Sequence, residues 1–523
     1  MTRVLGLSIL LAAVSPLRAT EPLHEAIDRI IAAQAEKDGL VLAGRSDDAE
    51  FLRRVWLDLA GTIPPATGAA EFLVDPSPSK RAKLFDDLLA APTYAPAMAN
   101  RFHVLLMERL GDHPTWSAYL QSSFAANKPW NTLIEEMLAA NGKTEGTRGA
   151  AFFLAKRLEN YGQQSVEYSA LTRDVGRLFL GVNLQCAECH DHLTIDDYKQ
   201  QHFQGLHAFF RNLSLAPGAV PAVAEKPTTE KARFTSVFTL QESRTGPALP
   251  GGKMIDIPAF PNGQEFALLS DKKTNSPGVP KFSTLAAAAK ELPTADNRAF
   301  VRNAVNRLWF VLMGRGLVHP LDLHHAGNPA SHPELLDRLE REFVAHMFDI
   351  QWLFREILLS DAYQRSSLLP VGTKDTPPAK SFVVALEKRI SAEALFAAVS
   401  TATGTKATDA TKAKFVKAFA NQPREPEEEV EASLKAALFL SHDATVLDML
   451  APKTGNLVDR LGKLADDDAF ADELYLTVLT RNPSAEERAT VAKVLAKPNR
   501  SREAATRKLA WALLASLEFG VNH

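Results

Sequence analysis

Apolar residues recur at helical spacing through most of the first two hundred positions. Asp47 and Glu50 have the spacing of a capping box, which predicts a helix that begins after Asp47 and ends before Gly61. The same period of apolar residues, interrupted by Pro, Gly and Asn, predicts further helices over residues 80–90, 97–110, 116–127 and 130–140.

The apolar spacing of residues 171–182 continues through Cys186 and Cys189. A continued 3–4 spacing predicts that both thiols project from the same side of one helix, or of its last turn, with His190 just round from them.

The pattern changes after about Asn212. Nine prolines fall between Pro217 and Pro280, and helical periodicity is nearly lost. Short β-favouring pieces at residues 234–240 and 254–257 predict a small β-containing or irregular insert over residues 213–282.

Helical periodicity returns in the second half. Ser331 and Glu334 predict another capping box, and Ser484 and Glu487 a further one. Helices are predicted over residues 297–313, 332–346, 350–360, 433–440, 469–479, 486–495 and 504–519. The stretch 401–429, rich in Lys, Thr and Glu, is expected to be partly mobile. We therefore expect a mainly α protein with two helical domains, 22–212 and 283–523, separated by the irregular insert.

Net charge and the distribution of apolar runs narrow the classes of function and the location of the protein. With 59 Lys+Arg against 62 Asp+Glu, the formal net charge of −3 gives no pull toward nucleic acid. Residues 1–19 have the pattern of a secretory signal peptide, with Arg3, an apolar run over residues 4–14 and the small Ala19. No later apolar run predicts a membrane span. The sequence therefore predicts an exported protein of the periplasm or cell envelope.

Both cysteines of the chain lie in one motif, Cys186-Ala187-Glu188-Cys189-His190. Cys-x-x-Cys-His is the attachment pattern of c-type haem, in which two thiols bind the porphyrin and the adjacent imidazole binds the iron. Export and this motif support each other, because haem c is attached after export. The prediction is a covalent haem c with His190 as the proximal ligand. The distal ligand stays open among His103, Met107, His202, His207 and Met254.

Alternatives to haem remain. Cys186 and Cys189 with two of His192, His202 and His207 would make a sound tetrahedral zinc set. A short-range disulfide or a redox dithiol is a third interpretation, although the helical surroundings lack the βαβ context of a thioredoxin-like pair. The rest of the sequence contains no recognised catalytic constellation, so whether the chain is an enzyme stays open.

Several blocks resemble a known pair of domains. Residues 51–61, 63–65 and 180–192 resemble the planctomycete-type cytochrome c-like domain of unknown function, and residues 303–309, 314–318, 328–337 and 518–523 resemble its companion planctomycete-type C-terminal domain. Leu193 departs from the proline usual after the cysteine motif.

The resemblance implies export and a covalent haem, with no established reaction. It also implies, by association only, a link to exported polysaccharide-processing proteins. The expected function is electron transfer or redox support with an unknown redox partner protein. The alternative is a non-enzymatic binding or scaffold protein of a polysaccharide-processing system, in which the Cys/His cluster holds zinc or is structural.

Overall fold

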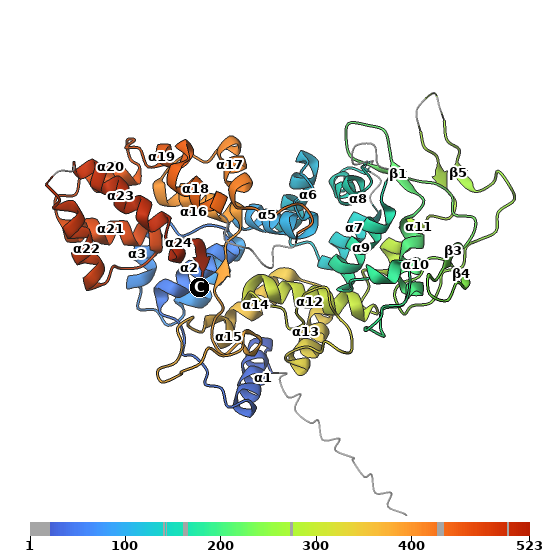
Figure 1. Ribbon diagram of the computed structural model, residues 1–523, viewed down its shortest axis with the longest axis horizontal. Helices are drawn as coiled ribbons and strands as arrows, with labels where there is room; N and C mark the ends of the chain where they lie inside the picture. The colour runs from blue at the N-terminus through green and yellow to red at the C-terminus, as the bar shows by residue number, and fades with distance from the viewer. Residues whose placement is uncertain are drawn as a thin grey trace, which may run out of the picture.

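The computed structural model describes residues 21–139, 142, 144–159, 166–271, 273, 276–425, 434–498 and 501–523. The predicted signal peptide at residues 1–19 lies outside them. Within the described residues the chain is mainly α-helical, as the sequence predicted, and its strands are short (Figure 1).

Each predicted helix has a counterpart with boundaries shifted by a few residues, and further helices lie where none was predicted. The α-helices are α1 Leu23–Lys37, α2 Asp48–Leu59, α3 Ala66–Val74, α4 Lys80–Ala90, α5 Tyr94–Met107, α6 Pro114–Ala125, α7 Trp130–Ala139, α8 Phe152–Arg157, α9 Tyr168–Leu180, α10 Gln200–Phe210, α11 Thr284–Glu291, α12 Arg298–Met313, α13 Pro333–Ala345, α14 Ile350–Leu359, α15 Asp361–Gln364, α16 Ala392–Thr403, α17 Asp409–Phe419, α18 Leu434–His442, α19 Ala444–Met449, α20 Leu457–Gly462, α21 Asp467–Leu479, α22 Ala485–Leu495, α23 Arg502–Leu514 and α24 Leu517–Gly520. Those without a predicted counterpart include α1, α3, α10, α11, α16, α17 and α20. Three short 3₁₀ helices are η1 Arg148–Ala151, η2 Cys186–Glu188 and η3 Ala379–Ser381.

Side chains cap two of the three helix N-termini at which the sequence predicted a capping box. Asp47 caps α2 by accepting a hydrogen bond from the Glu50 amide at 2.8 Å, and Ser484 and Glu487 form the full reciprocal box of α22. The box predicted from Ser331 and Glu334 does not form. His332 occupies the N-cap position of α13, and its side chain makes no capping hydrogen bond.

In the part of the chain that the structure describes, eight strands form four antiparallel two-stranded sheets. Three sheets lie between residues 213 and 280, in the predicted insert: β1 Leu213–Leu215 with β2 Val223–Glu225, β3 Ala232–Thr235 with β4 Glu242–Thr245, and β5 Phe266–Leu268 with β6 Val279–Pro280. The fourth joins β7 Lys388–Arg389 to β8 Val521–Asn522 at the end of the chain. The strand predicted at residues 234–240 is wrong beyond Thr235, where the chain turns toward β4, and residues 254–257 form no strand.

Two hydrophobic cores hold the molecule together. The first takes its buried residues from Leu23 to Phe382, so it draws on both predicted helical domains. The second is built from residues 390–519, together with Leu57 and Ile63 of the N-terminal part. Figure 1 shows α16–α24 gathered at one end, close to α2 and α3, while β3, β4 and β5 lie at the opposite end.

Residues 401–429, expected to be partly mobile, contain the regular helix α17. This helix buries Phe415 in the second core against Phe396 and Phe439, with ring centroids 5.3 and 5.0 Å apart. The charged residues that suggested mobility lie on its outer face, as in any amphipathic helix. Residues 426–429 lie outside the described residues. No described helix is long and apolar enough to cross a membrane.

Candidate functional site

The cysteine motif does not continue α9, contrary to the sequence expectation. α9 ends at Leu180 because Gly181 adopts a left-handed conformation with φ of 70°. A side chain there would also collide with His324 and Asn303, at 2.7 and 2.9 Å from the added carbon. Cys186 and Cys189 lie instead on the separate turn η2 and its cap, where both thiols are exposed.

His190 is oriented by its own backbone. Its Nδ1 lies 2.7 Å from the carbonyl oxygen of Asp191, so Nδ1–H donates to that carbonyl and Nε2 is left with its lone pair. This is the usual arrangement of a histidine that binds a metal through Nε2. Two exposed thiols and one oriented imidazole therefore lie on five consecutive residues, a donor set that fits c-type haem.

A turn of the insert covers one side of the motif, which the sequence did not indicate. The amide of Val237 donates to the carbonyl of Cys189 at 3.2 Å, and the Phe238 ring lies 4.5 Å from the His190 ring. Four apolar side chains of this turn and of the motif loop remain open to solvent: Val237 (56% exposed), Phe238 (63%), Leu240 (78%) and Leu193 (74%). Exposed apolar side chains beside the two thiols and the His190 imidazole form a surface that another apolar group can cover.

Side chains of α10 hold the motif turn in place by hydrogen bonds. The side-chain amides of Gln200 and Gln204 both donate to the carbonyl of Glu188, at 3.5 and 2.9 Å. Gln200 also donates to the carbonyl of Thr235, which fixes the insert strand to the same point. The backbone N–H of Gln200 donates to the Asp191 carboxylate at 2.9 Å. The motif loop and the insert turn are thus positioned by one helix.

The second half of the chain braces the same region. A loop between α12 and α13 meets the motif loop through the Ala326 amide, which donates to Asp197 at 2.5 Å, and through Tyr198, whose hydroxyl donates to the His324 carbonyl at 3.1 Å. The His324 amide donates to the carbonyl of Gly181 at 2.9 Å. Asp197 therefore anchors a loop of the other half.

Polar residues of α12 fasten α9 from the side. Asn303, almost fully buried, donates to the carbonyl of Leu178 at 2.8 Å, and Arg307 donates to the carbonyl of Arg177 at 2.9 Å. Both acceptors belong to the last turn of α9, where the Arg177 carbonyl also accepts from the Gly181 amide at 3.2 Å. Asn306 is bonded to both the amide and the carbonyl of Val318.

Charged residues of α9 are buried and paired. Arg157 donates to Asp174 at 2.8 Å, and Arg177 pairs with Glu108 at 2.7 Å. Burial alone raises the pKa of Asp174, but the two arginines outweigh it and hold the pKa below its ordinary value. This network ties α9 to α5 and α8 and so fixes the element that leads to the motif.

The histidines of the zinc hypothesis have other partners. His192 accepts hydrogen bonds from the amides of Thr194 and Ile195, so it holds its own loop. The His202 Nδ1 lies 3.0 Å from the carbonyl of Asp197. His207 lies on α10, 3.1 Å from the Thr172 hydroxyl, and burial, aided by Arg211, lowers its pKa to about 4. Across the described part of the chain, no three His, Cys, Asp or Glu side chains gather as a metal site.

The remaining distal candidates are spread widely. His103 accepts a hydrogen bond from the Trp116 indole at 3.0 Å, and burial lowers its pKa. Met107 is fully buried, with its sulfur 3.7 Å from an Arg157 nitrogen. Met254 lies in an insert loop, where it is partly exposed. His103 and Met107 thus serve the first core.

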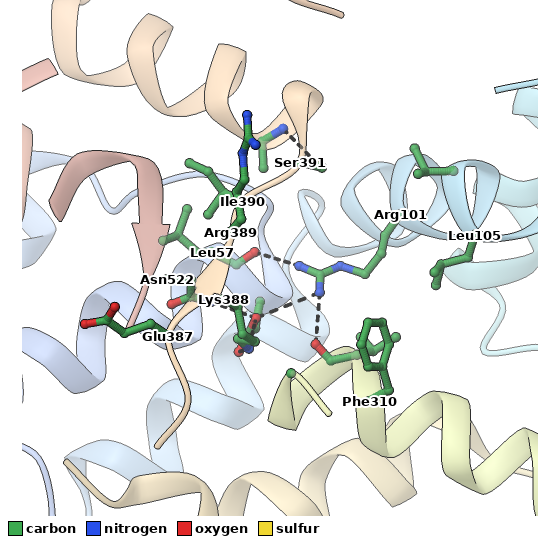
Figure 2. A pocket seen from close by; sticks show the side chains of 15 residues that line it. Leu57, Arg101, Leu105, Phe310, Glu387, Lys388, Arg389, Ile390, Ser391 and Asn522 are labelled. Carbon is green, nitrogen blue, oxygen red and sulfur yellow. Dashed lines mark hydrogen bonds and ion pairs between the residues drawn. The ribbon is translucent and has the colours of Figure 1, made fainter. Parts of the chain in front are cut away.

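A second polar centre lies beside a cavity of about 210 Å³ between the two cores (Figure 2). Asp58 is 1% exposed and accepts hydrogen bonds from Lys388, Tyr363 and Asn522, at 2.7, 2.8 and 2.8 Å. Lys388 also donates to the carbonyl of Leu312, and burial lowers its pKa to about 8. Arg101 donates to the carbonyls of Leu57 and Val311.

This centre joins sequence blocks that are far apart. Asp58 belongs to the first block that carries the family resemblance, residues 51–61, and Asn522 to the last, near the end of the chain. The Asp58 carboxylate is bonded by side chains from three distant segments of the chain, so the centre acts as a clamp between the cores.

Comparison with known proteins assigns the class. The PSCyt2 family, described as a protein of unknown function (DUF1549), matches residues 26–214, and the PSD1 family, described as a protein of unknown function (DUF1553), matches residues 286–450. The chain therefore carries a match to PSCyt2 followed by a match to PSD1, in the order that the resemblance implied. No curated protein and no solved structure matches it.

Proposed function

We propose that this protein carries a covalently attached c-type haem and acts in electron transfer or redox support outside the cytoplasm. One observation carries the proposal: the His190 imidazole is bonded through Nδ1 to the Asp191 carbonyl, which leaves Nε2 available on the same turn as two exposed thiols. A bound haem would supply one-electron chemistry.

The chain's own residues have distinct roles in this proposal. Cys186 and Cys189 would hold the group covalently, and His190 would bind its iron. Val237, Phe238, Leu240 and Leu193 offer an apolar surface that the group would shield from water. Apolar shielding and limited water access are among the factors that set the reduction potential in such sites, together with the axial ligands.

The motif lies where an unknown redox partner protein could reach it. Because the turn lies at the surface, a redox partner protein can approach it directly, with no opening of the fold. The proposed export to the periplasm or cell envelope is consistent with haem attachment and with the predicted signal peptide at residues 1–19.

The test is expression of the precursor in a host competent for haem c maturation. We expect a c-type pyridine haemochrome spectrum and a haem-stained band that survives denaturation. Both should vanish in Cys186→Ala combined with Cys189→Ala. The matched control is His202→Asn, which alters a neighbouring histidine of the zinc set and should leave the covalent band in place.

Two results would overturn the proposal. One is a purified precursor product without haem that contains stoichiometric zinc by elemental analysis, lost on Cys186→Ala. The other is a protein with neither metal nor haem, which would favour the scaffold alternative for an exported polysaccharide-processing system.

A further inference from the structure

A cavity of about 730 Å³ lies away from the cysteine motif, between the end of α1 and the start of α13. Four separate segments wall it, around residues 34–40, 315–319, 328–332 and 378–381. Its volume lies within the range of small-molecule sites. Two of these segments, 315–318 and 328–332, come from the blocks that characterise the second domain.

Two cations of this wall are uncompensated. Among the residues that the structure describes, neither Arg315 nor Lys380 has an ion-pair partner, and the Nε atom of Arg315 is buried without a hydrogen bond. The one carboxylate of the wall, Asp38, already accepts two hydrogen bonds from Gln34, at 3.1 and 3.0 Å. The cavity therefore favours a negatively charged ligand.

His332 adds an independent sign of a ligand. It lines the cavity, is only 3% exposed, and its Nδ1 lies 3.1 Å from the Ser331 hydroxyl. Its Nε2 is buried and has no partner in the protein. Buried polar atoms are normally paired, so an orphan nitrogen in a cavity wall points to a missing partner. His332 is also the N-cap residue of α13, and its side chain makes no capping hydrogen bond to that helix. The helix therefore does not supply the missing partner.

We propose that this cavity binds a small molecule that carries an oxyanion group, namely a carboxylate, phosphate or sulfate. Arg315 and Lys380 hold the oxyanion, since a guanidinium presents a planar fork of donors that matches it. The His332 Nε2 bonds a second polar atom of the same molecule. This site is distinct from the proposed haem site and does not depend on it.

The test is titration calorimetry of the full chain with three probes: sodium sulfate, sodium phosphate and sodium glucuronate, each up to about 10 mM. We expect saturable binding of at least one probe, weakened about tenfold or more in Arg315→Gln and to a smaller degree in Lys380→Gln. Arg341→Gln, an exposed arginine of α13 outside the cavity, should leave binding unchanged.

Each outcome is decisive. Preference for glucuronate identifies an organic acid as the ligand, and preference for the inorganic salts identifies the free ion, and both support the site. Failure of all three probes to bind overturns the proposal, as does equal weakening by Arg341→Gln, which would show general charge attraction. Lys380 is exposed, so Lys380→Gln keeps the test valid if Arg315→Gln does not fold.

Discussion

The cysteine turn and the Asp58 clamp are built on opposite principles. At the clamp, the Asp58 carboxylate accepts hydrogen bonds from Lys388, Tyr363 and Asn522, and the Lys388 ammonium balances its charge. At the turn, two thiols and one imidazole nitrogen are left free while apolar side chains stay in water. A closed set of contacts stabilises a fold, whereas an open set of donors beside apolar surface is what a site for another molecule requires. The predictions below separate the two regions on this basis.

The largest effect is expected at the clamp. Asp58→Ala leaves the buried Lys388 ammonium without its counter-charge, so the free energy of unfolding should fall by about 3–5 kcal/mol in denaturant titration. The control is Asp87→Ala, which breaks an exposed pair with Lys83 and should cost about 0.5 kcal/mol or less. Equal losses in the two variants would refute the clamp.

The second largest effect is expected at the hydrogen bond by which Asn303 of α12 holds the last turn of α9. Asn303→Ala removes the donor to the Leu178 carbonyl and strands a buried acceptor, which should cost about 1–3 kcal/mol by the same titration. Asn482→Ala, at an exposed position, should stay within about 0.5 kcal/mol. A cost at Asn303 no larger than this would mean that this hydrogen bond contributes nothing.

A pH effect is expected at His324, which lies in the loop that docks on the motif loop. Burial, with Arg307 and Arg302 adding to it, lowers the pKa of His324 to about 3. Below pH 6.5 the unfolded chain therefore takes up a proton that the folded chain refuses, and stability falls as the pH falls.

The measurement is the free energy of unfolding at pH 7 and pH 5.5. The loss between the two values should be about 1 kcal/mol smaller in His324→Gln than in the unchanged chain. Asn482→Ala, at an exposed position without a titratable side chain, is the control and should keep the full loss. An unchanged loss in His324→Gln would mean that this ring does not titrate as burial predicts.

The smallest effect belongs to the cysteines. Cys186→Ser with Cys189→Ser, in protein made without haem maturation, should change the unfolding free energy by less than about 0.5 kcal/mol, because both thiols are exposed. Calorimetric melting is the check. A loss comparable to that of Asp58→Ala would assign the motif to the fold and would end the contrast between the two regions.

Local pattern determined much of this protein. Apolar periodicity located most helices, since an amphipathic helix needs only its own residues and a core to face, and the caps at Asp47 and Ser484 are contacts within one turn. The Cys-x-x-Cys-His motif and the two-domain class were likewise readable, because each lies in short contiguous blocks.

Only the tertiary structure decided the surroundings of these blocks. The apparent continuation of α9 into the cysteines failed because Gly181 must turn the chain close against His324, a residue far along the sequence. Phe238 beside His190, the meeting of Asp58 with Asn522, and the cavity around His332 likewise join segments that no local spacing relates. Periodicity reports which face of an element is buried, but the partner of that face is chosen by packing the whole chain.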